Sequence, residues 1–390
     1  MLNRYHSRCN PLNMKAVIVD WCRSPFHRAH KGELANVRPD EIASQVAKSL
    51  LDRNTIKGED IDDLIIGGAY PEGEQGYNIG RLMTFLSDLP SDVPGMTINR
   101  LCGSSMQALL TAAANIEVGW GDCYLIGGVE SMSRVKRRGF NWSPHPDLEN
   151  IFPEAYISMG QTAENVAAKW NQTRSDHELF ALNSHKKSKS AADNGYFDAE
   201  LVSIETDSNI IDKDGCIRGN TTLERMAKLP PAFGEDGVVT AATSSPLTDG
   251  AAFMIVCSED FAKEHEINPI ARIVAGAVTG CPPELMGIGP INATKLALKR
   301  AHWTVDEVEI FELNEAFASQ SLAVISELKI PQEKVNLDGG ALAIGHPLGA
   351  SGLRISGKAA SLLQRTGKNR AIATMCIGGG MGISIALERF

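Results

Sequence analysis

Long apolar runs are missing from this sequence. None approaches the roughly 18 residues that a membrane-spanning helix needs, so we expect no membrane span. Residues 1–13 are polar and lack the apolar centre of a secretory signal. We therefore expect a disordered tail over 1–13, with Met14 as an alternative start of the chain, and we expect the protein to be cytoplasmic.

Paired cysteines are also missing. The eight cysteines are scattered and form no C-x-x-C pair, which argues against a zinc site and against a dense disulfide framework. Without an export signal, reduced thiols are the default state. We therefore expect no metal and no permanently bound cofactor, and each cysteine is open to interpretation as a core residue or a reactive thiol.

An excess of positive charge is absent as well. Lys and Arg total 38 against 47 Asp and Glu, a net charge of -9, which argues against a nucleic-acid partner. A phosphate-bearing ligand would need a local basic patch. One basic run, at Arg134, Lys136, Arg137 and Arg138, fits either such a patch or a partner surface, although a solvated charged loop is the simpler interpretation.

What the sequence does contain is the alternation of an α/β protein. Its 390 residues, 43% of them hydrophobic, are enough for two or three domains. Short β-branched runs alternate with helical patterns over two stretches of the chain. The predicted strands are 15–20, 63–69, 97–99, 123–129, 251–258, 271–280, 309–313, 334–337, 371–376 and 382–388; the predicted helices are 40–52, 80–86, 102–118, 161–170, 175–194, 292–302, 315–328 and 350–364.

The two stretches resemble each other. Residues 60–66 (DIDDLII) and 305–311 (VDEVEIF) share an order of charged and apolar positions, and each leads from a helix through a strand into another helix. This favours a duplicated half over coincidence. The polar, turn-rich segment 131–245 interrupts the first copy and is expected to be an inserted subdomain that covers a site.

Two motifs place a reactive side chain at the start of a predicted helix. Cys102 lies in 99–106 (NRLCGSSM), where the helix dipole is expected to favour the thiolate and lower the pKa of the thiol. His346 lies in 339–352 (GGALAIGHPLGASG), where the same field favours the neutral imidazole of a base or hydrogen-bond donor. A buried structural cysteine and a histidine in a glycine turn are the alternatives.

Two further motifs are weaker on their own. Cys376 ends a predicted strand and precedes a glycine loop, 376–380 (CIGGG), whose amides are able to form an oxyanion hole; a plain turn is the alternative. Asn314, in 314–318 (NEAFA), is able to hold a water molecule, to cap the following helix, or to do both.

Taken in order, these motifs resemble the thiolase family. The resemblance runs from Met14 to Phe390 and also includes the segments 127–133 (GGVESMS), 159–165 (MGQTAEN) and 248–252 (TDGAA). It implies an α/β thiolase-like fold: two duplicated mixed-sheet βαβαβαββ halves in a layered αβαβα arrangement with an inserted loop subdomain. The expected segments are 14–130 and 246–269 for the N-terminal half, 131–245 for the insertion and 270–390 for the C-terminal half.

The resemblance also implies residue roles. Cys102 is similar to the family's acyl-accepting nucleophile, His346 to its base, Cys376 to its second acid and base, and Asn314 to the residue that holds an oxyanion-hole water. The backbone amide of Gly378, with that of Cys102, would bind the acyl oxygen. For coenzyme A, which is a co-substrate, the implied contacts are Ser245 on the pantetheine arm, Arg218 near the adenine, and Met159.

Individual residues within the motifs differ between biosynthetic and degradative thiolases. Ser158 stands before Met159 where short-chain biosynthetic thiolases often have His, and 243–246 reads TSSP in place of NASG. The sequence is therefore interpreted as a degradative 3-ketoacyl-CoA thiolase similar to those of bacterial fatty-acid oxidation. The alternatives are an acetyl-CoA acetyltransferase, which would share every catalytic residue, and a non-catalytic acyl-CoA- or lipid-binding paralogue. The family further implies a homodimer or dimer of dimers, and a hydratase–dehydrogenase partner.

Overall fold

A computed structural model describes residues 16–390; the expected tail at 1–13 and the alternative start at Met14 lie outside the described residues. The backbone is organised around a 10-stranded sheet with the order β10-β11-β12-β9-β1-β8-β5-β3-β4, in which β2 (His27–Arg28) lies off this path beside β8. The strands of the path are β1 (Ala16–Arg23), β3 (Asp63–Gly67), β4 (Gly95–Ile98), β5 (Cys123–Ser131), β8 (Thr248–Ser258), β9 (Ala271–Gly280), β10 (Ile310–Leu313), β11 (Arg370–Ile377) and β12 (Met381–Arg389).

The two halves of the sheet have the same strand order when they are counted outwards from the centre. From the centre outwards, β1-β8-β5-β3 matches β9-β12-β11-β10, and β1 meets β9 in a short antiparallel pairing at Val17 and Ile18. In each half the outer pair is parallel and the inner pairs are antiparallel. The strand order therefore repeats as the sequence comparison of 60–66 with 305–311 predicted.

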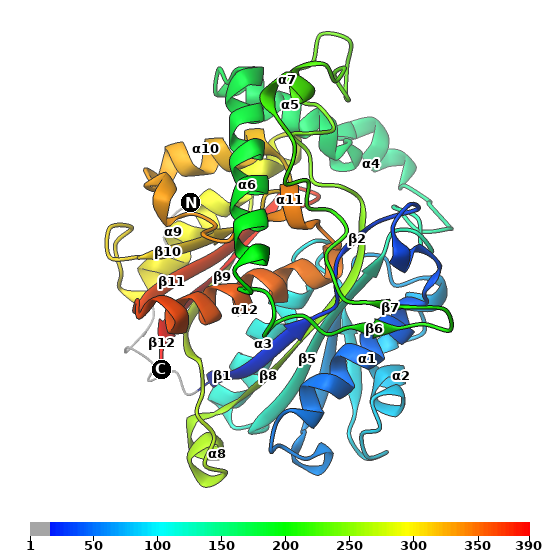
Figure 1. Cartoon of the computed structure of the whole chain (residues 1–390), viewed down its shortest axis with the longest axis vertical. Coiled ribbons are helices and arrows are strands. Elements are labelled where there is room, and N and C mark those ends of the chain that lie inside the picture. The colour runs from blue at the N-terminus through cyan, green and yellow to red at the C-terminus, as the bar shows by residue number, and fades with distance from the viewer. Residues whose placement is uncertain (1–15) are drawn as a thin grey trace.

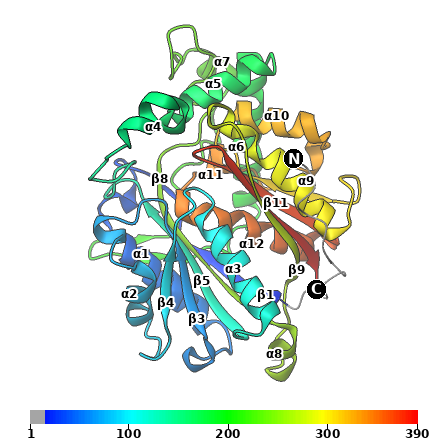
Figure 2. The same ribbon diagram turned by 180° about the vertical axis from the view of Figure 1, so that it is seen from behind.

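Helices fill the layers around the sheet (Figure 1). The central helices α3 (Ser104–Val118) and α12 (Leu348–Thr366) pack between the two halves, inside one core cluster that contains residues of both. The helices α1 (Pro39–Asp52) and α2 (Ile79–Leu86) cover the outer face of the N-terminal half, and α9 (Gly289–Ala301) and α10 (Ala318–Leu328) cover that of the C-terminal half (Figure 2). The layers are thus helix, sheet, helix, sheet and helix, as expected.

The insertion lies over one end of this scaffold. It contains α4 (Pro146–Ile151), a 3-10 turn at Pro153–Tyr156, α5 (Met159–Lys169), α6 (Arg174–Asp193), the short pair β6 (Ile204–Glu205) and β7 (Ile210–Ile211), and α7 (Leu223–Ala227). The helices α4, α5 and α7 gather above the sheet edges in Figure 1. Two of these helices, α5 and α6, match the helical patterns predicted at 161–170 and 175–194.

Three local predictions are wrong. The strand predicted at 334–337 is a single parallel bridge between Val335 and Phe311 after a 3-10 turn. The backbone of Asn336 has a φ of 46°, and its side chain accepts from the Leu313 N–H at 2.8 Å and donates to the Leu313 carbonyl at 2.9 Å. The side chain thus makes the hydrogen bonds that a strand backbone would make.

The other two errors concern helix starts. Cys102 precedes α3, which begins at Ser104 with Gly103 as its N-cap. Helix α10 begins at Ala318 with Phe317 as its N-cap, so Glu315 lies before the helix and Asn314 does not cap it. In both places the residues before the helix are held by tertiary contacts, which helical periodicity does not report.

Candidate active site

Cys102 lies in a tight turn between β4 and α3. Leu101 has a φ of 45°, a left-handed conformation that a branched side chain rarely adopts. Side chains hold it there: the Asn99 Oδ1 accepts from the Leu101 N–H at 2.8 Å, and the Ser104 hydroxyl donates to the Leu101 carbonyl at 2.6 Å. The strained turn presents Cys102 at the junction of strand and helix rather than inside the helix.

The ionisation predicted for Cys102 is wrong for the free protein. Burial raises the pKa of its thiol to about 11, although the Gly378 backbone N–H bonds to the sulfur and opposes the rise. A helix terminus contributes about 1 kcal/mol or less, which is under one pKa unit, whereas burial shifts a pKa by up to about 3–5 units. Desolvation therefore outweighs the helix dipole, and the resting group is a thiol.

His346 precedes α12 and is neutral, as predicted. Burial lowers the pKa of its imidazole to about 3, and the charge of Arg354 lowers it further. The Ser351 hydroxyl donates its proton to the Pro347 carbonyl at 2.8 Å, so it accepts from the His346 Nδ1–H at 2.6 Å. The Nε2 atom then carries the lone pair and accepts from the Asn314 Nδ2–H at 3.3 Å. This tautomer leaves Nε2 able to take a proton.

Cys376, the penultimate residue of β11, lies beside this pair. Burial raises the pKa of its thiol far above the usual range, and the nearby Cys102 and Cys281 sulfurs raise it further. The loop that follows turns through Gly379 and Gly380, which have φ values of 79° and 80°. A Cβ on Gly380 would lie 2.3 Å from the Cys281 carbonyl, so this position requires glycine. The turn aims the Gly378 N–H at the Cys102 sulfur.

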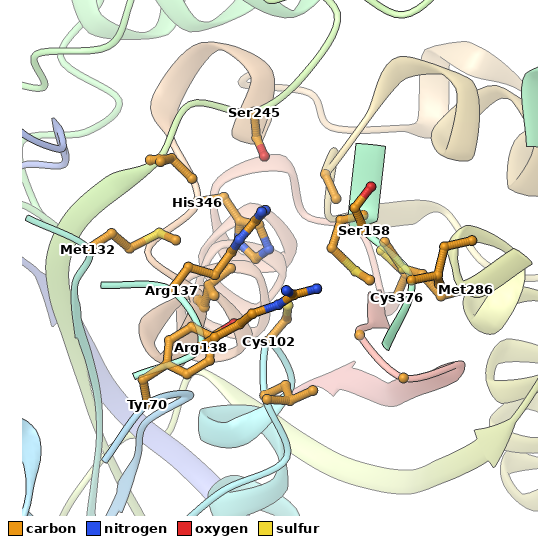
Figure 3. A pocket seen from close by; sticks show the side chains of 18 of the residues that line it. Tyr70, Cys102, Met132, Arg137, Arg138, Ser158, Ser245, Met286, His346 and Cys376 are labelled. Atoms are coloured by element: carbon orange, nitrogen blue, oxygen red, sulfur yellow. The ribbon is translucent and has the colours of Figure 1, made fainter. Parts of the chain in front are cut away.

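One cavity of about 320 Å³ collects these groups. Cys102, His346 and Cys376 all line it, and Figure 3 shows their side chains directed into the same space. Its remaining walls are mostly apolar, and the insertion supplies Tyr156, Ser158 and Met159 on one side. The expectation that 131–245 covers the site is consistent with this wall. A buried cavity with two thiols, a neutral imidazole and directed amides is suited to acyl transfer.

Comparison with known proteins supplies the family. Residues 16–260 match the family model "Thiolase, N-terminal domain", and residues 267–389 match "Thiolase, C-terminal domain". The chain belongs to the thiolase family. It is 41% identical to the 3-ketoacyl-CoA thiolase of Bacillus subtilis over 387 residues, which is 96% of this chain and 99% of that protein. It is 45% identical to the 3-ketoacyl-CoA thiolase of Pseudoalteromonas translucida over 383 residues, covering 96% and 98%.

Solved structures agree on the thiolase fold. The crystal structure of human mitochondrial 3-ketoacyl-CoA thiolase in complex with CoA has a TM-score of 0.89 and 36% sequence identity, and covers 97% of this chain and 99% of that one. The Bacillus anthracis acetyl-CoA acetyltransferase gives the same four values. The chain therefore has the thiolase fold. Because both kinds of enzyme share this fold, the fold by itself does not separate cleavage from condensation.

A second cavity of about 720 Å³ adjoins the first in this thiolase. The two share Ser245, Pro246 and Leu247. Arg218 lines only this second cavity, whose other cationic side chains are Arg28, Lys31 and Arg225. The structure thus separates the three expected coenzyme A contacts: Met159 lines the catalytic cavity, Ser245 lies at the junction of the two cavities, and Arg218 lies in the basic one.

Two residues of this site went unrecognised in the sequence. Ser351, which sets the tautomer of His346, lies inside the quoted glycine-rich motif and looked like a small helix residue. Glu130 is fully buried and accepts from the Ala69 N–H and the Gly349 N–H, each at 2.9 Å. It joins the end of β3 to the start of α12. A charged residue inside the otherwise apolar strand pattern of 123–131 was the available signal.

No helix within residues 16–390 is long and apolar enough to cross a membrane. The same residues contain no group of three or more His, Cys, Asp or Glu side chains placed to hold a metal ion.

Proposed function

We propose that this chain is a 3-ketoacyl-CoA thiolase that cleaves its substrate with coenzyme A through an acyl-Cys102 intermediate. The observation that carries the proposal is the meeting of Cys102, His346 and Cys376 in one mostly apolar cavity, with the Gly378 N–H on the Cys102 sulfur. The names of the relatives support the same reaction.

The first half-reaction forms the thioester. Because the Cys102 thiol and the His346 imidazole are both neutral at rest, attack on the 3-keto carbon and transfer of the thiol proton to Nε2 occur together. The amides of Cys102 and Gly378 bind the oxygen that becomes negative. The C2–C3 bond then breaks, its electrons enter the enolate of acetyl-CoA, and the Cys376 thiol protonates that carbon.

The enolate oxygen needs its own donors. Once protonated, the His346 Nε2–H is one donor. Asn314 faces it, and the Oδ1 atom of Asn314 is buried without a partner among the described residues. An acceptor in this position is able to hold a water molecule that donates to the same oxygen, the role expected for Asn314.

The second half-reaction regenerates the enzyme. Coenzyme A enters, the Cys376 thiolate takes its thiol proton, and the resulting sulfur attacks the acyl-Cys102 carbonyl. The shortened acyl-CoA leaves, and the Cys102 sulfur recovers its proton from His346. No group beyond these side chains and coenzyme A is required for the atoms to balance. Ping-pong kinetics follow from the two separate steps.

The pantetheine arm is proposed to pass Ser245, where the two cavities join, with Met159 on the opposite wall beside Gly378. The phosphates and adenine then occupy the basic cavity with Arg218. Four cationic side chains there supply the local positive charge that the net charge of -9 does not.

The test is intact-mass analysis after incubation with 3-ketoacyl-CoAs of several lengths, followed by digestion to locate the adduct. We expect an acyl group on Cys102, lost in Cys102→Ala. Cys281→Ala is the matched control, because Cys281 is a second partly buried thiol near Cys376 that does not line the cavity, and it should keep the adduct. An acyl group on another residue, or turnover that survives in Cys102→Ala, contradicts the proposal.

The same experiment separates the alternatives. An acetyl-CoA acetyltransferase loads acetyl groups from acetyl-CoA and turns over acetoacetyl-CoA in preference to longer chains. A non-catalytic paralogue gives no adduct with any substrate. That alternative predicts the loss of a reactive residue, yet Cys102, His346, Cys376 and Asn314 are all present and gathered together.

The proposed assembly is a homodimer or a dimer of dimers. Among residues 16–390, β4 is the last strand of the sheet, so one of its edges has no described strand beside it, and Tyr77 nearby is 91% exposed. A second copy paired along β4 would cover both. Light scattering is the test, with Tyr77→Lys expected to weaken the assembly; a monomer at all concentrations would contradict it. We also propose a cytoplasmic location and a hydratase–dehydrogenase partner, to be tested by cell fractionation and co-purification.

A further inference from the structure

The basic run after β5 does not behave as one patch. Arg134 pairs with Glu74, and the Lys136 Nζ lies 5.9 Å from the ring centroid of Phe140. Arg137 and Arg138 instead line the catalytic cavity, and Figure 3 shows both side chains extending over it. No Asp or Glu is among the described residues that line this cavity, so the two positive charges meet no carboxylate there.

Arg138 is held by its neighbours. Its guanidinium lies 4.6 Å from the Trp142 ring centroid and donates to the Tyr156 carbonyl at 2.9 Å. The Trp142 and Tyr156 rings meet edge to face with their centroids 5.5 Å apart. A guanidinium has five N–H donors, and the one bond to Tyr156 leaves the others available. The contacts thus hold the Arg138 guanidinium in place and leave several of its N–H groups free to donate to a ligand.

Arg137 is less occupied still. Within residues 16–390 it makes no hydrogen bond, ion pair or ring contact, and it interacts electrostatically with the Tyr70 hydroxyl. Tyr70 lines the same cavity, and burial raises the pKa of its phenol to about 12, so it is a neutral donor. Two guanidinium groups and a phenol therefore offer donors to the same space.

The phosphates of coenzyme A do not account for these arginines. The basic cavity with Arg218 lies beyond Ser245, and it already matches the negative charge of a nucleotide. In Figure 3, Arg138 and Tyr70 are well separated from Ser245, with His346 between them, and Arg137 lies beside His346. The acyl chain of a 3-ketoacyl-CoA leaves the reacting carbon away from the pantetheine arm, and Arg137 and Arg138 both line the cavity that would receive it.

We propose that Arg137 and Arg138 bind a carboxylate at the far end of the acyl chain, so that the preferred substrates are 3-ketodicarboxyl-CoAs. This inference rests on the proposed function and specifies its substrate class. The methylene groups of the chain pack against the apolar wall, and the terminal carboxylate accepts charge-assisted hydrogen bonds from the guanidinium groups. A terminal methyl group would accept no hydrogen bond from either arginine.

The experiment compares kcat/KM for three 3-ketoacyl-CoA series of matched length, ending in a methyl group, a carboxylate or the methyl ester of that carboxylate. At the best length, the wild-type enzyme should favour the carboxylate over its ester by about tenfold or more, the scale of a hydrogen bond between charged groups. The preference should shrink as salt is added, because both arginines are exposed at the cavity mouth.

Substitutions test whether the preference for a terminal carboxylate depends on the two arginines. Arg137→Gln and Arg138→Gln should each lower kcat/KM for the carboxylate series by about tenfold and leave the methyl series within twofold or so. Arg137→Lys, which keeps the charge, should restore part of the preference. Lys136→Gln is the matched control, because it removes one positive charge from the same segment without touching the cavity.

The two proposals fail in different ways. If all three series are cleaved equally well, or if Lys136→Gln acts like the arginine variants, the carboxylate site is wrong while the thiolase function stands. If no series is cleaved and no adduct forms on Cys102, the thiolase function is wrong and the substrate class falls with it.

Discussion

The central helices of the two halves, α3 and α12, begin in a similar way, but different reactive side chains precede them. Cys102 lies two residues before the first residue of α3, and His346 lies two residues before the first residue of α12. Each position follows a residue with a positive φ, 45° at Leu101 and 111° at Gly345. The two halves thus bring two corresponding chain positions to one cavity.

The neighbours of the two turns make the difference. The Cys102 sulfur receives a backbone N–H from the other half, whereas His346 is held by Ser351 of its own half. The helices approach so closely that a Cβ on Gly352 would lie 2.5 Å from the Met106 nitrogen. The repeated plan therefore brings two helix starts into contact, one preceded by the proposed nucleophile and the other by the proposed base.

If that division of labour is right, removing the second thiol should split the reaction. Cys376→Ser should lower overall turnover by about 10³-fold or more, because the enolate loses its proton donor and coenzyme A loses its base. The Cys102 thiol remains, so acyl exchange that needs no C–C chemistry should still label it. Steady-state kinetics and intact mass together check this. Loss of the adduct along with turnover would show that Cys376 is needed for loading.

The ionisation of the two turns predicts an unusual pH profile. With the pKa of Cys102 at about 11 and that of His346 at about 3, both groups are neutral between these values. Alkylation of Cys102 by iodoacetamide should therefore rise about tenfold per pH unit from pH 7 to pH 10, as thiolate forms. A preformed thiolate–imidazolium pair would instead give a plateau across this range. Mass-resolved labelling rates distinguish the two.

The tautomer of His346 gives a smaller effect. Ser351→Ala removes the acceptor of the Nδ1–H and should lower kcat by about tenfold or more, with a shifted pH profile. Ser351→Thr, which restores the hydroxyl, should recover activity. Ser356→Ala is the control, because Ser356 is equally buried on α12 and donates to the Gly352 carbonyl without contacting the site. Equal losses in both alanine variants would mean a structural effect.

Arg218 belongs to the insertion rather than to either half, and its effect should be the smallest. Arg218→Gln should raise the KM for coenzyme A severalfold and leave kcat unchanged, since the contact is remote from the reacting atoms. The increase should diminish at high salt. A fall in kcat without a change in KM would place Arg218 in a different role.

Local sequence determined the elements and the candidate residues. Apolar runs located nine of the strands, because strands covered on both faces read as continuous apolar segments, but they missed the two-residue strands β2, β6 and β7. The motifs predicted the site residues, because a cysteine, a histidine and glycine-rich turns in this order along the chain are specific to the thiolase family. The repeat of 60–66 in 305–311 also anticipated the mirrored strand order.

Only the tertiary structure decided how those residues behave. Cys102, His346 and Cys376 are far apart in the chain, and their meeting depends on the packing of α3 against α12. Burial reversed the ionisation expected for Cys102, because desolvation is set by surrounding atoms and not by position on a helix. The same holds for the basic run after β5. In the sequence, its four cationic residues cannot be told apart. In the structure, only Arg137 and Arg138 of the four line the catalytic cavity.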